Sequence, residues 1–238
     1  MPEWLKRLLR PVYFLVFRLR GYPGLRVHTL PIARMVNEYD DVWTYYFLKP
    51  ADLTYEAGQY VHVIAPNAYL TNHTVRHMSF ASAPAEPEIA ISMDLASGSR
   101  FKRRFRRARV GHTVGFHTVR GGFVRDRTTE DRPLLFIAGG IGIAPIRAHI
   151  AELGESEADW SLIYAGRDYL YRDEWGAWPG RVAFVGRASL FAAIERRIGV
   201  PDQICFVCGS AGFVTDVKDF LAASGVEPDR IRTEKFDY

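Results

Sequence analysis

Apolar and polar residues follow two different periods along the chain, and the change between them predicts two domains of different fold class. In the first half, short alternating runs are separated by turn-forming residues, a pattern typical of antiparallel strands. The expected strands cover residues 26–36, 42–48, 60–65, 77–81, 89–94 and 113–118, with one basic helix at 99–107. Short, closely spaced strands favour a small closed antiparallel barrel, because closure removes exposed sheet edges.

The second half alternates apolar runs with helical patterns. Expected strands cover residues 134–138, 161–165, 182–185, 204–207 and 230–234, with helices that include 190–198 and 213–224. This alternation predicts a parallel sheet with helices on both faces. We therefore expect a basic N-terminal segment at 1–24, an all-β antiparallel barrel at 25–128, and an α/β domain with a parallel sheet at 129–238.

The N-terminal segment combines helical apolar spacing with interleaved basic residues in WLKRLLRPVYFLVFRLR, residues 4–20. Its uncharged run, residues 11–17, is far shorter than the roughly 20 residues of a membrane-spanning helix. No small-residue cleavage site follows, so a cleaved signal peptide is not indicated. Two interpretations stay open: packing on a protein surface, or peripheral contact with a membrane interface through residues 4–20.

The composition of the 238 residues, with 48% hydrophobic and 24% charged, is ordinary for a soluble chain of two domains. Cys205 and Cys208 are the two cysteines, which is too few for a disulfide framework or for the four thiolates of an iron–sulfur cluster. We expect Cys205 to be a core residue. The histidines show no zinc-ligand spacing, so no metal is predicted, and a cytoplasmic setting is the default.

The net charge of +4 is concentrated in one stretch, residues 102–109, which contains one lysine and five arginines. A solvated helix face is one interpretation of such a cluster. The other is a docking surface for an acidic protein partner. Nucleic acid is not predicted as a partner, because no nucleic-acid-binding motif accompanies the cluster.

Four motifs in the first half share one order: AGQYVHVIAP at residues 57–66, RHMSFASAP at 76–84, GSRF at 98–101 and GGF at 121–123. This order resembles the flavin-binding half of the ferredoxin–NADP reductase family. The resemblance implies FAD as cofactor, with FMN as the alternative. The residues that it implies for flavin binding are Arg76, His77, Met78, Ser79, Gly98, Ser99, Arg100 and Phe101.

The chemistry of these residue types suits a flavin diphosphate. The Arg76 guanidinium can pair with phosphate oxygens in a bidentate manner, and a helix that starts near Ser99 offers backbone N–H groups. By resemblance, the Ser79 hydroxyl lies near the flavin N5 atom and is predicted to be catalytic. Met78 stands where the family usually has a tyrosine that stacks on the flavin ring; a thioether can also pack on a ring.

The second half carries GGIGIAP, residues 139–145, at its first strand-to-helix turn. Open α/β sheets bind ligands at such turns, and glycines let a backbone approach a pyrophosphate. The spacing differs from GxGxxG and resembles the nicotinamide-binding half of the same family, which implies NADPH or NADH contacts by Gly139, Gly140, Gly142 and Pro145. A tight turn required by packing is the alternative.

The end of the chain, residues 206–238, resembles the family's closing strand–Cys-Gly–helix–strand segment. The resemblance places Cys208 and Gly209 beside the nicotinamide with Glu234 close by, so Cys208 and Glu234 join Ser79 as predicted catalytic residues. Tyr238 is a candidate for covering the flavin, with a frayed terminus as the alternative. Arg167 and Arg187, at strand ends, could bind a 2′-phosphate, which favours NADPH.

The resemblance spans residues 25–236 and implies an NAD(P)H-dependent flavoprotein reductase without an iron–sulfur domain. Electrons would pass from NAD(P)H through FAD to an acceptor, expected to be an acidic electron-transfer protein or an oxygenase. Two alternatives stay open. One is a reductase of small acceptors such as ferric chelates, free flavin or quinones. The other is a non-catalytic redox-sensing or assembly subunit, which Met78 keeps under consideration.

Overall fold

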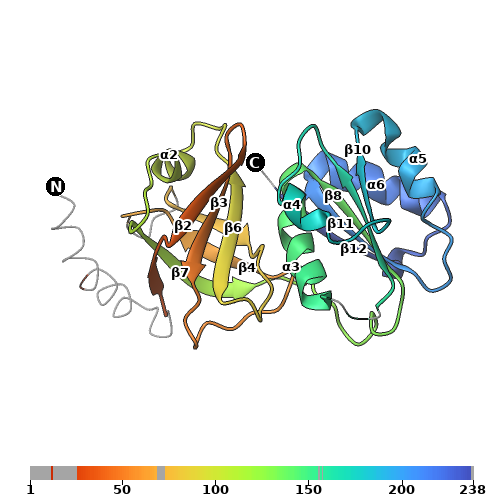
Figure 1. The fold of residues 1–238 in the computed structure, drawn as a ribbon. Helices are drawn as coiled ribbons and strands as arrows, with labels where there is room; N and C mark the ends of the chain where they lie inside the picture. Colours follow the sequence, from red (N-terminus) through yellow and green to blue (C-terminus); the bar gives the residue numbers. More distant parts are fainter. Residues whose placement is uncertain (1–11, 13–25, 69–72, 155, 157, 237–238) are drawn as a thin grey trace. The chain divides into compact units, whose positions relative to one another are not determined.

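The computed structural model describes Val12 and residues 26–68, 73–154, 156 and 158–236, shown in Figure 1. The expectations about residues 4–20 and about Tyr238 fall outside these described residues. The chain forms two compact units, and each is described by itself. The first unit comprises Met1–Tyr55, Tyr60–Ser79 and Glu86–Arg120; the second comprises Glu56–Gln59, Phe80–Ala85 and Gly121–Tyr238.

The first unit is built from antiparallel strands in two sheets, with the orders β1-β7-β4-β5 and β2-β3-β6. The strands are β1 (His28–Pro31), β2 (Arg34–Tyr39), β3 (Val42–Leu48), β4 (Tyr60–Ile64), β5 (Val75–Ser79), β6 (Glu88–Asp94) and β7 (Thr113–Arg120), and the helix is α2 (Arg100–Arg106). The rings of Phe47 on β3 and Phe116 on β7 meet edge to face at 4.8 Å, so the two sheets pack on each other. The all-β antiparallel barrel class is confirmed.

The expected single strand at 26–36 was wrong. It is broken at Ile32 and Ala33, where the chain passes from one sheet to the other. The backbone N–H of Ile32 donates to His112, beside β7, whereas the N–H of Ala33 donates to Tyr46 on β3. Pro31 has no N–H to continue the first ladder. The strands therefore form two sheets rather than one continuous closed ladder.

The second unit is a parallel sheet of five strands in the order β10-β9-β8-β11-β12. The expected α/β class with a parallel sheet is confirmed. Its strands are β8 (Leu134–Gly139), β9 (Trp160–Ala165), β10 (Val182–Val185), β11 (Ile204–Ser210) and β12 (Ile231–Phe236). Its helices are α3 (Ile143–Leu153), α4 (Arg172–Trp175), α5 (Leu190–Glu195) and α6 (Ala211–Ala223), with a 3-10 turn η1 (Gly140–Gly142) before α3.

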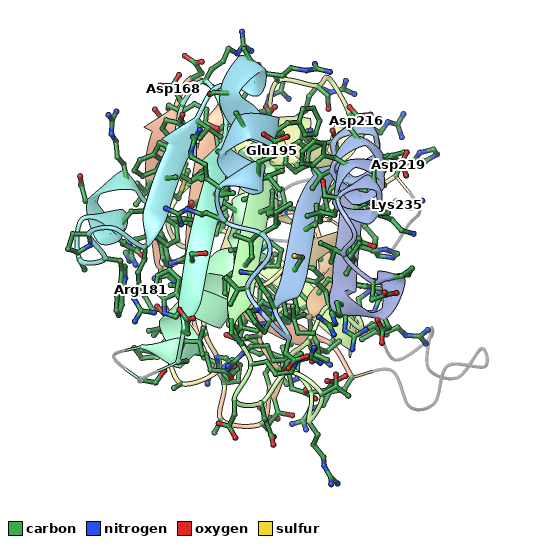
Figure 2. The ribbon with its side chains drawn as sticks, turned by 90° about the vertical axis from the view of Figure 1, so that its right-hand side faces the viewer. Asp168, Arg181, Glu195, Asp216, Asp219 and Lys235 are labelled. Carbon is green, nitrogen blue, oxygen red and sulfur yellow. The ribbon has the colours of Figure 1, made fainter. Side chains whose placement is uncertain are left out.

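Both faces of this sheet are covered, which explains its long apolar runs. One core contains Cys205 and Val207 with residues of α5 and α6, so Cys205 is a core residue as predicted. Figure 2 looks onto this side, with Glu195 on α5 and Asp216 on α6. On the other face, the ring of His149 from α3 lies among Phe123, Phe136 and Phe206.

Candidate functional site

The motif in β5 lies on a strand at the end of its sheet, shifted by two residues from the expected strand at 77–81. β5 pairs with β4 from Val75 to Ser79 and then leaves the ladder. Arg76 therefore lies inside the strand. It is exposed, as is His77, whereas Met78 is half-buried and Ser79 is buried. This arginine lies outside the core, and its Nη1 atom donates to the carbonyl of Val75 at 2.7 Å.

Helix α2 begins at a capped N-terminus next to exposed Gly98 and Arg100. The Ser99 hydroxyl accepts a hydrogen bond from the backbone N–H of Lys102 at 3.2 Å. No acidic residue lies in the first turn, so nothing there competes with an anion for the positive end of the helix. The Phe101 side chain is buried and packs on Phe105, so only the backbone of Phe101 could contact a cofactor.

Arg76 on β5 and Lys102 on α2 are cations that interact with each other. The pKa of the Lys102 ammonium is lowered by partial burial first; Asp94 opposes this, and the charge of Arg76 lowers the pKa further. Two neighbouring cations beside a helix start suit an anion that carries more than one charge. The donor set of the first unit therefore fits a flavin diphosphate.

A row of rings crosses the opposite face of this sheet and was not predicted. His62 stacks on His77 at 4.2 Å and meets His117 at 5.0 Å, and Tyr60 stacks on His77 at 5.1 Å. Cross-strand register creates the row, because His62 on β4 pairs with His77 on β5 and with His117 on β7. The His77 side chain thus points away from the face of Arg76 and Met78, and its predicted flavin contact would use its backbone.

His117 is the buried member of this row. Burial, followed by His62 and His77, lowers its pKa to about 4, so the ring is neutral at neutral pH. Its Nδ1 atom lies 3.0 Å from the hydroxyl of Thr118, and its Nε2 atom has no partner among the described residues. Thr118 has φ +53° beside a shift in register between β4 and β7. Such an irregularity re-aims side chains locally.

In the second unit, packing requires three of the predicted glycines. A Cβ atom on Gly142 would lie 2.3 Å from the carbonyl oxygen of Cys208. Cβ atoms on Gly139 and Gly209 would come within 2.8 Å and 2.6 Å of the Phe213 ring. The turn after β8 therefore lies directly against the carboxyl end of β11, and no larger residue fits between them.

Gly140 differs from these glycines. It has φ +52°, which glycine adopts without strain, and a Cβ atom on it would have no neighbour within 4 Å. The backbone of this turn is thus open to approach at Gly140. Pro145 is buried in the first turn of α3, where proline suits helix geometry, so its side chain serves packing.

The strand order reverses between β8 and β11, and the two glycine turns lie at this reversal. Ligands of open α/β sheets bind at the carboxyl ends of the strands at such a point. Arg167 follows β9 and Arg187 follows β10, so both exposed arginines lie at the same edge. Figure 2 shows Asp168 at this edge and Arg181 at the opposite one. The geometry fits a dinucleotide.

Cys208 and Glu234 are aligned neighbours on β11 and β12. Cys208 is fully buried, and burial, followed by the charge of Glu234, raises the pKa of its thiol well above the usual value. Cys208 is therefore a neutral thiol. Burial also raises the pKa of the Glu234 carboxyl. The structure brings these two predicted residues together at the reversal point.

The basic stretch at 102–109 divides into structural and exposed members. The Arg104 guanidinium donates to the carbonyls of Pro66 and Asn67 at 3.1 and 3.2 Å. Arg106 donates to the carbonyl of Leu95 at 2.7 Å and pairs with Asp41 at 3.0 Å. These two side chains hold α2 to neighbouring loops, although Arg106 is itself exposed, as are Arg107 and Arg109.

The described part of the chain lacks two kinds of feature. No helix in it is both long and apolar enough to cross a membrane. No group of three or more His, Cys, Asp or Glu side chains within it is arranged to hold a metal ion.

Comparisons with known proteins agree with this geometry. The chain is 29% identical over 193 residues to the carnitine monooxygenase reductase subunit of Escherichia coli, covering 74% of this chain and 57% of that protein. It is 27% identical over 240 residues to the ferredoxin reductase component of 3-ketosteroid-9-alpha-monooxygenase of Mycobacterium tuberculosis, covering 90% and 66%. The chain thus spans less than two thirds of the length of either relative. A comparison with protein-family models finds no match.

Among solved structures, a ferredoxin NADP+ reductase from Neisseria gonorrhoeae with bound FAD and NADP superimposes with a TM-score of 0.72 at 16% identity. The match covers 88% of this chain and 98% of that one. At this identity the match shows the fold. Together with the relatives named as reductase components of oxygenases, it confirms the resemblance inferred from the motifs.

Proposed function

We propose that this chain, related to ferredoxin–NADP reductase-type proteins, is a flavin-dependent NAD(P)H reductase that passes electrons to an electron-transfer protein or an oxygenase. One observation carries the proposal: exposed Arg76 on β5 and Lys102 on the capped helix α2 are cations that interact with each other, as a site for a diphosphate requires. The relatives named as reductase subunits of oxygenases, and the similar fold with bound FAD and NADP, support it.

The first unit supplies the flavin site in this proposal. Arg76 and Lys102 bind the diphosphate of FAD, or the phosphate of FMN as the alternative, and the backbone at Gly98–Arg100 donates to its oxygens. When bound, the flavin accepts a hydride and releases electrons singly. Ser79 is the last residue of β5 and is buried; its role of orienting the reacting edge of the ring rests on the resemblance and not on the face of the strand. Met78 packs on a ring face in place of an aromatic stack.

The second unit supplies the nucleotide site. The open backbone at Gly140 receives the pyrophosphate, and Arg167 and Arg187 bind a 2′-phosphate, which favours NADPH over NADH. Cys208, a fully buried neutral thiol, adds no charge at this edge. Glu234, whose pKa is raised by burial, can hold a proton at the same edge.

An absorption spectrum under anaerobic conditions tests the proposal. The purified chain, reconstituted with FAD or FMN, is expected to show a flavin spectrum that bleaches with NADPH faster than with NADH. A chain that retains neither flavin contradicts the reductase function and leaves a redox-sensing or assembly role. A bound flavin that neither nucleotide reduces contradicts the nucleotide site alone.

The exposure of Arg107 and Arg109 supports an acidic protein as the acceptor. The rate of electron transfer to a ferredoxin should then fall steeply as ionic strength rises, while the rate to ferricyanide should change far less. The double variant Arg107→Glu and Arg109→Glu should lose only the ferredoxin rate. A matched control is Arg196→Glu, since Arg196 is exposed on the second unit. If the double variant and Arg196→Glu transfer electrons to the ferredoxin at the same rate, a small acceptor would be favoured.

A further inference from the structure

Helix α3 carries a buried arginine that the proposed chemistry does not use. Arg147 is 9% exposed, and its guanidinium contacts groups from other segments. Its Nη1 atom donates to the carbonyl of Ala81 at 2.9 Å. Its Nε atom donates to the Glu174 carboxylate at 2.8 Å. It also lies over the Tyr171 ring, 5.3 Å from the centroid. A charge this deeply buried is retained only where its contacts compensate for desolvation.

The Ala81 carbonyl belongs to the segment that leaves β5 directly after Ser79. Phe80 is tied by its N–H to the carbonyl of Gln59 at 3.0 Å, and Ala81 and Ser82 are buried. Displacing this segment would leave the Arg147 guanidinium without a buried charge-assisted hydrogen bond, a costly loss. The arginine therefore restrains the chain two residues beyond Ser79.

The other two contacts belong to the segment that follows Arg167. Glu174 lies in α4, and Tyr171, which precedes this helix, has φ +55°. A bulky residue in the left-handed region is strained and persists only where its surroundings hold it. The indole of Trp175 also donates to the carbonyl of Leu170 at 2.8 Å. One guanidinium thus joins the segment after Arg167 to the segment after Ser79.

We infer that Arg147 is a positioning residue for hydride transfer. It holds the backbone that follows Ser79 against α3, the helix that begins at the nucleotide turn. The inference rests on the proposed function. Hydride transfer is sensitive to geometry, and a misplacement of about 1 Å can slow a reaction by about 100-fold. Arginine suits the task because its planar fork donates in two fixed directions, whereas a lysine ammonium has no such fork.

The test compares Arg147→Lys and Arg147→Met with Arg181→Lys in the FAD-loaded protein. Arg181 is a matched control at the opposite edge of the sheet (Figure 2): it donates to the carbonyl of Ala158 at 2.8 Å and lies 5.0 Å from the Trp160 ring centroid. Stopped-flow measurement at saturating NADPH should show flavin reduction slowed by about 10- to 100-fold in both Arg147 variants. Nucleotide affinity and flavin content should be unchanged.

Further readouts separate positioning from a loss of stability. Arg147→Lys can keep the ion pair with Glu174, so it should remain folded even if Arg147→Met does not. Glu174→Gln leaves the hydrogen bond to Ala81 in place and should reduce flavin nearly as fast as the native chain. If the Arg147→Lys variant reduces flavin as fast as the Arg181→Lys variant, the positioning role is overturned and the proposed function is not. A native chain that binds no flavin overturns both this role and the proposed function.

Discussion

The two candidate cofactor sites were inferred from motifs of similar strength, yet the structure explains them in different ways. In the second unit, Gly139, Gly142 and Gly209 are required because two turns and the Phe213 ring lie too close for any Cβ atom. In the first unit, Arg76 is exposed on β5 and lies outside the core. A motif residue that packing requires says little about a ligand, whereas one that packing does not require is evidence for binding.

The largest effect should come from Gly142→Ala, which tests the packing side of this comparison. The new Cβ atom would lie 2.3 Å from a backbone oxygen, and overpacking of this kind should lower the free energy of unfolding by about 3 kcal/mol. Gly212→Ala is the control, because its Cβ atom meets nothing within 4 Å. Urea unfolding measures both. Equal stability of the two variants would show that the turns can separate.

The next largest effect should come from Arg76→Ala, which tests the binding side. Loss of a charge-assisted contact with phosphate should weaken flavin binding by about 2 kcal/mol, or about 30-fold. The unfolding free energy should stay unchanged because the side chain is exposed. Fluorescence titration with FAD measures the affinity, with Arg109→Ala as control. A variant that keeps full affinity but loses stability would make Arg76 a structural residue.

A smaller effect should appear with pH, because each unit buries a neutral histidine. Burial lowers the pKa of His149 to about 3 and that of His117 to about 4, both from 6.5. The unfolded chain takes up protons below pH 6.5 and the folded chain does not. Stability is therefore full above this pH and falls toward pH 4, by at most roughly 1.4 kcal/mol per pH unit for each histidine.

Urea unfolding at pH 7 and pH 5, monitored by tryptophan fluorescence, checks this sign. Trp160 and Trp175 are buried in the second unit, so their fluorescence reports its unfolding. His149→Gln removes the titrating group while it keeps a donor for the carbonyl of Phe123, which lies 2.8 Å from the native ring. Its unfolding free energy should depend less on pH. An unchanged dependence would rule out His149 as the source.

A loss of stability smaller than that of Gly142→Ala should come from Gly140→Ala, which lies where the two sides of the comparison meet. Its φ of +52° makes alanine strained, at about 1 kcal/mol, although the space around it is open. The added methyl group would stand where the nucleotide backbone approaches, so affinity for NADPH should fall more than stability does. Isothermal titration checks this; a loss of stability as large as that of Gly142→Ala would mean that Gly140 is also a packing residue.

Much of the fold was readable from local pattern. The strand at 182–185 and the one at 42–48 have the predicted bounds, because each is a short, mainly apolar run that the local pattern delimits. The strand predicted at 26–36 failed, since the transfer of Ile32 and Ala33 between sheets depends on partners far along the chain. The motif order located Arg76, Gly140 and Cys208, but whether each faces solvent or core was not in the motif.

The sequence by itself determined the two fold classes, their order and the segments that carry the candidate chemistry, because periodicity and turn residues act over a few neighbouring positions. Only the tertiary structure decided what those segments meet. Cross-strand register lined up His62, His77 and His117, strand order brought Gly142 against Cys208, and helix packing set Arg147 on the carbonyl of Ala81. Such contacts join residues that lie far apart in the chain, so no local pattern encodes them.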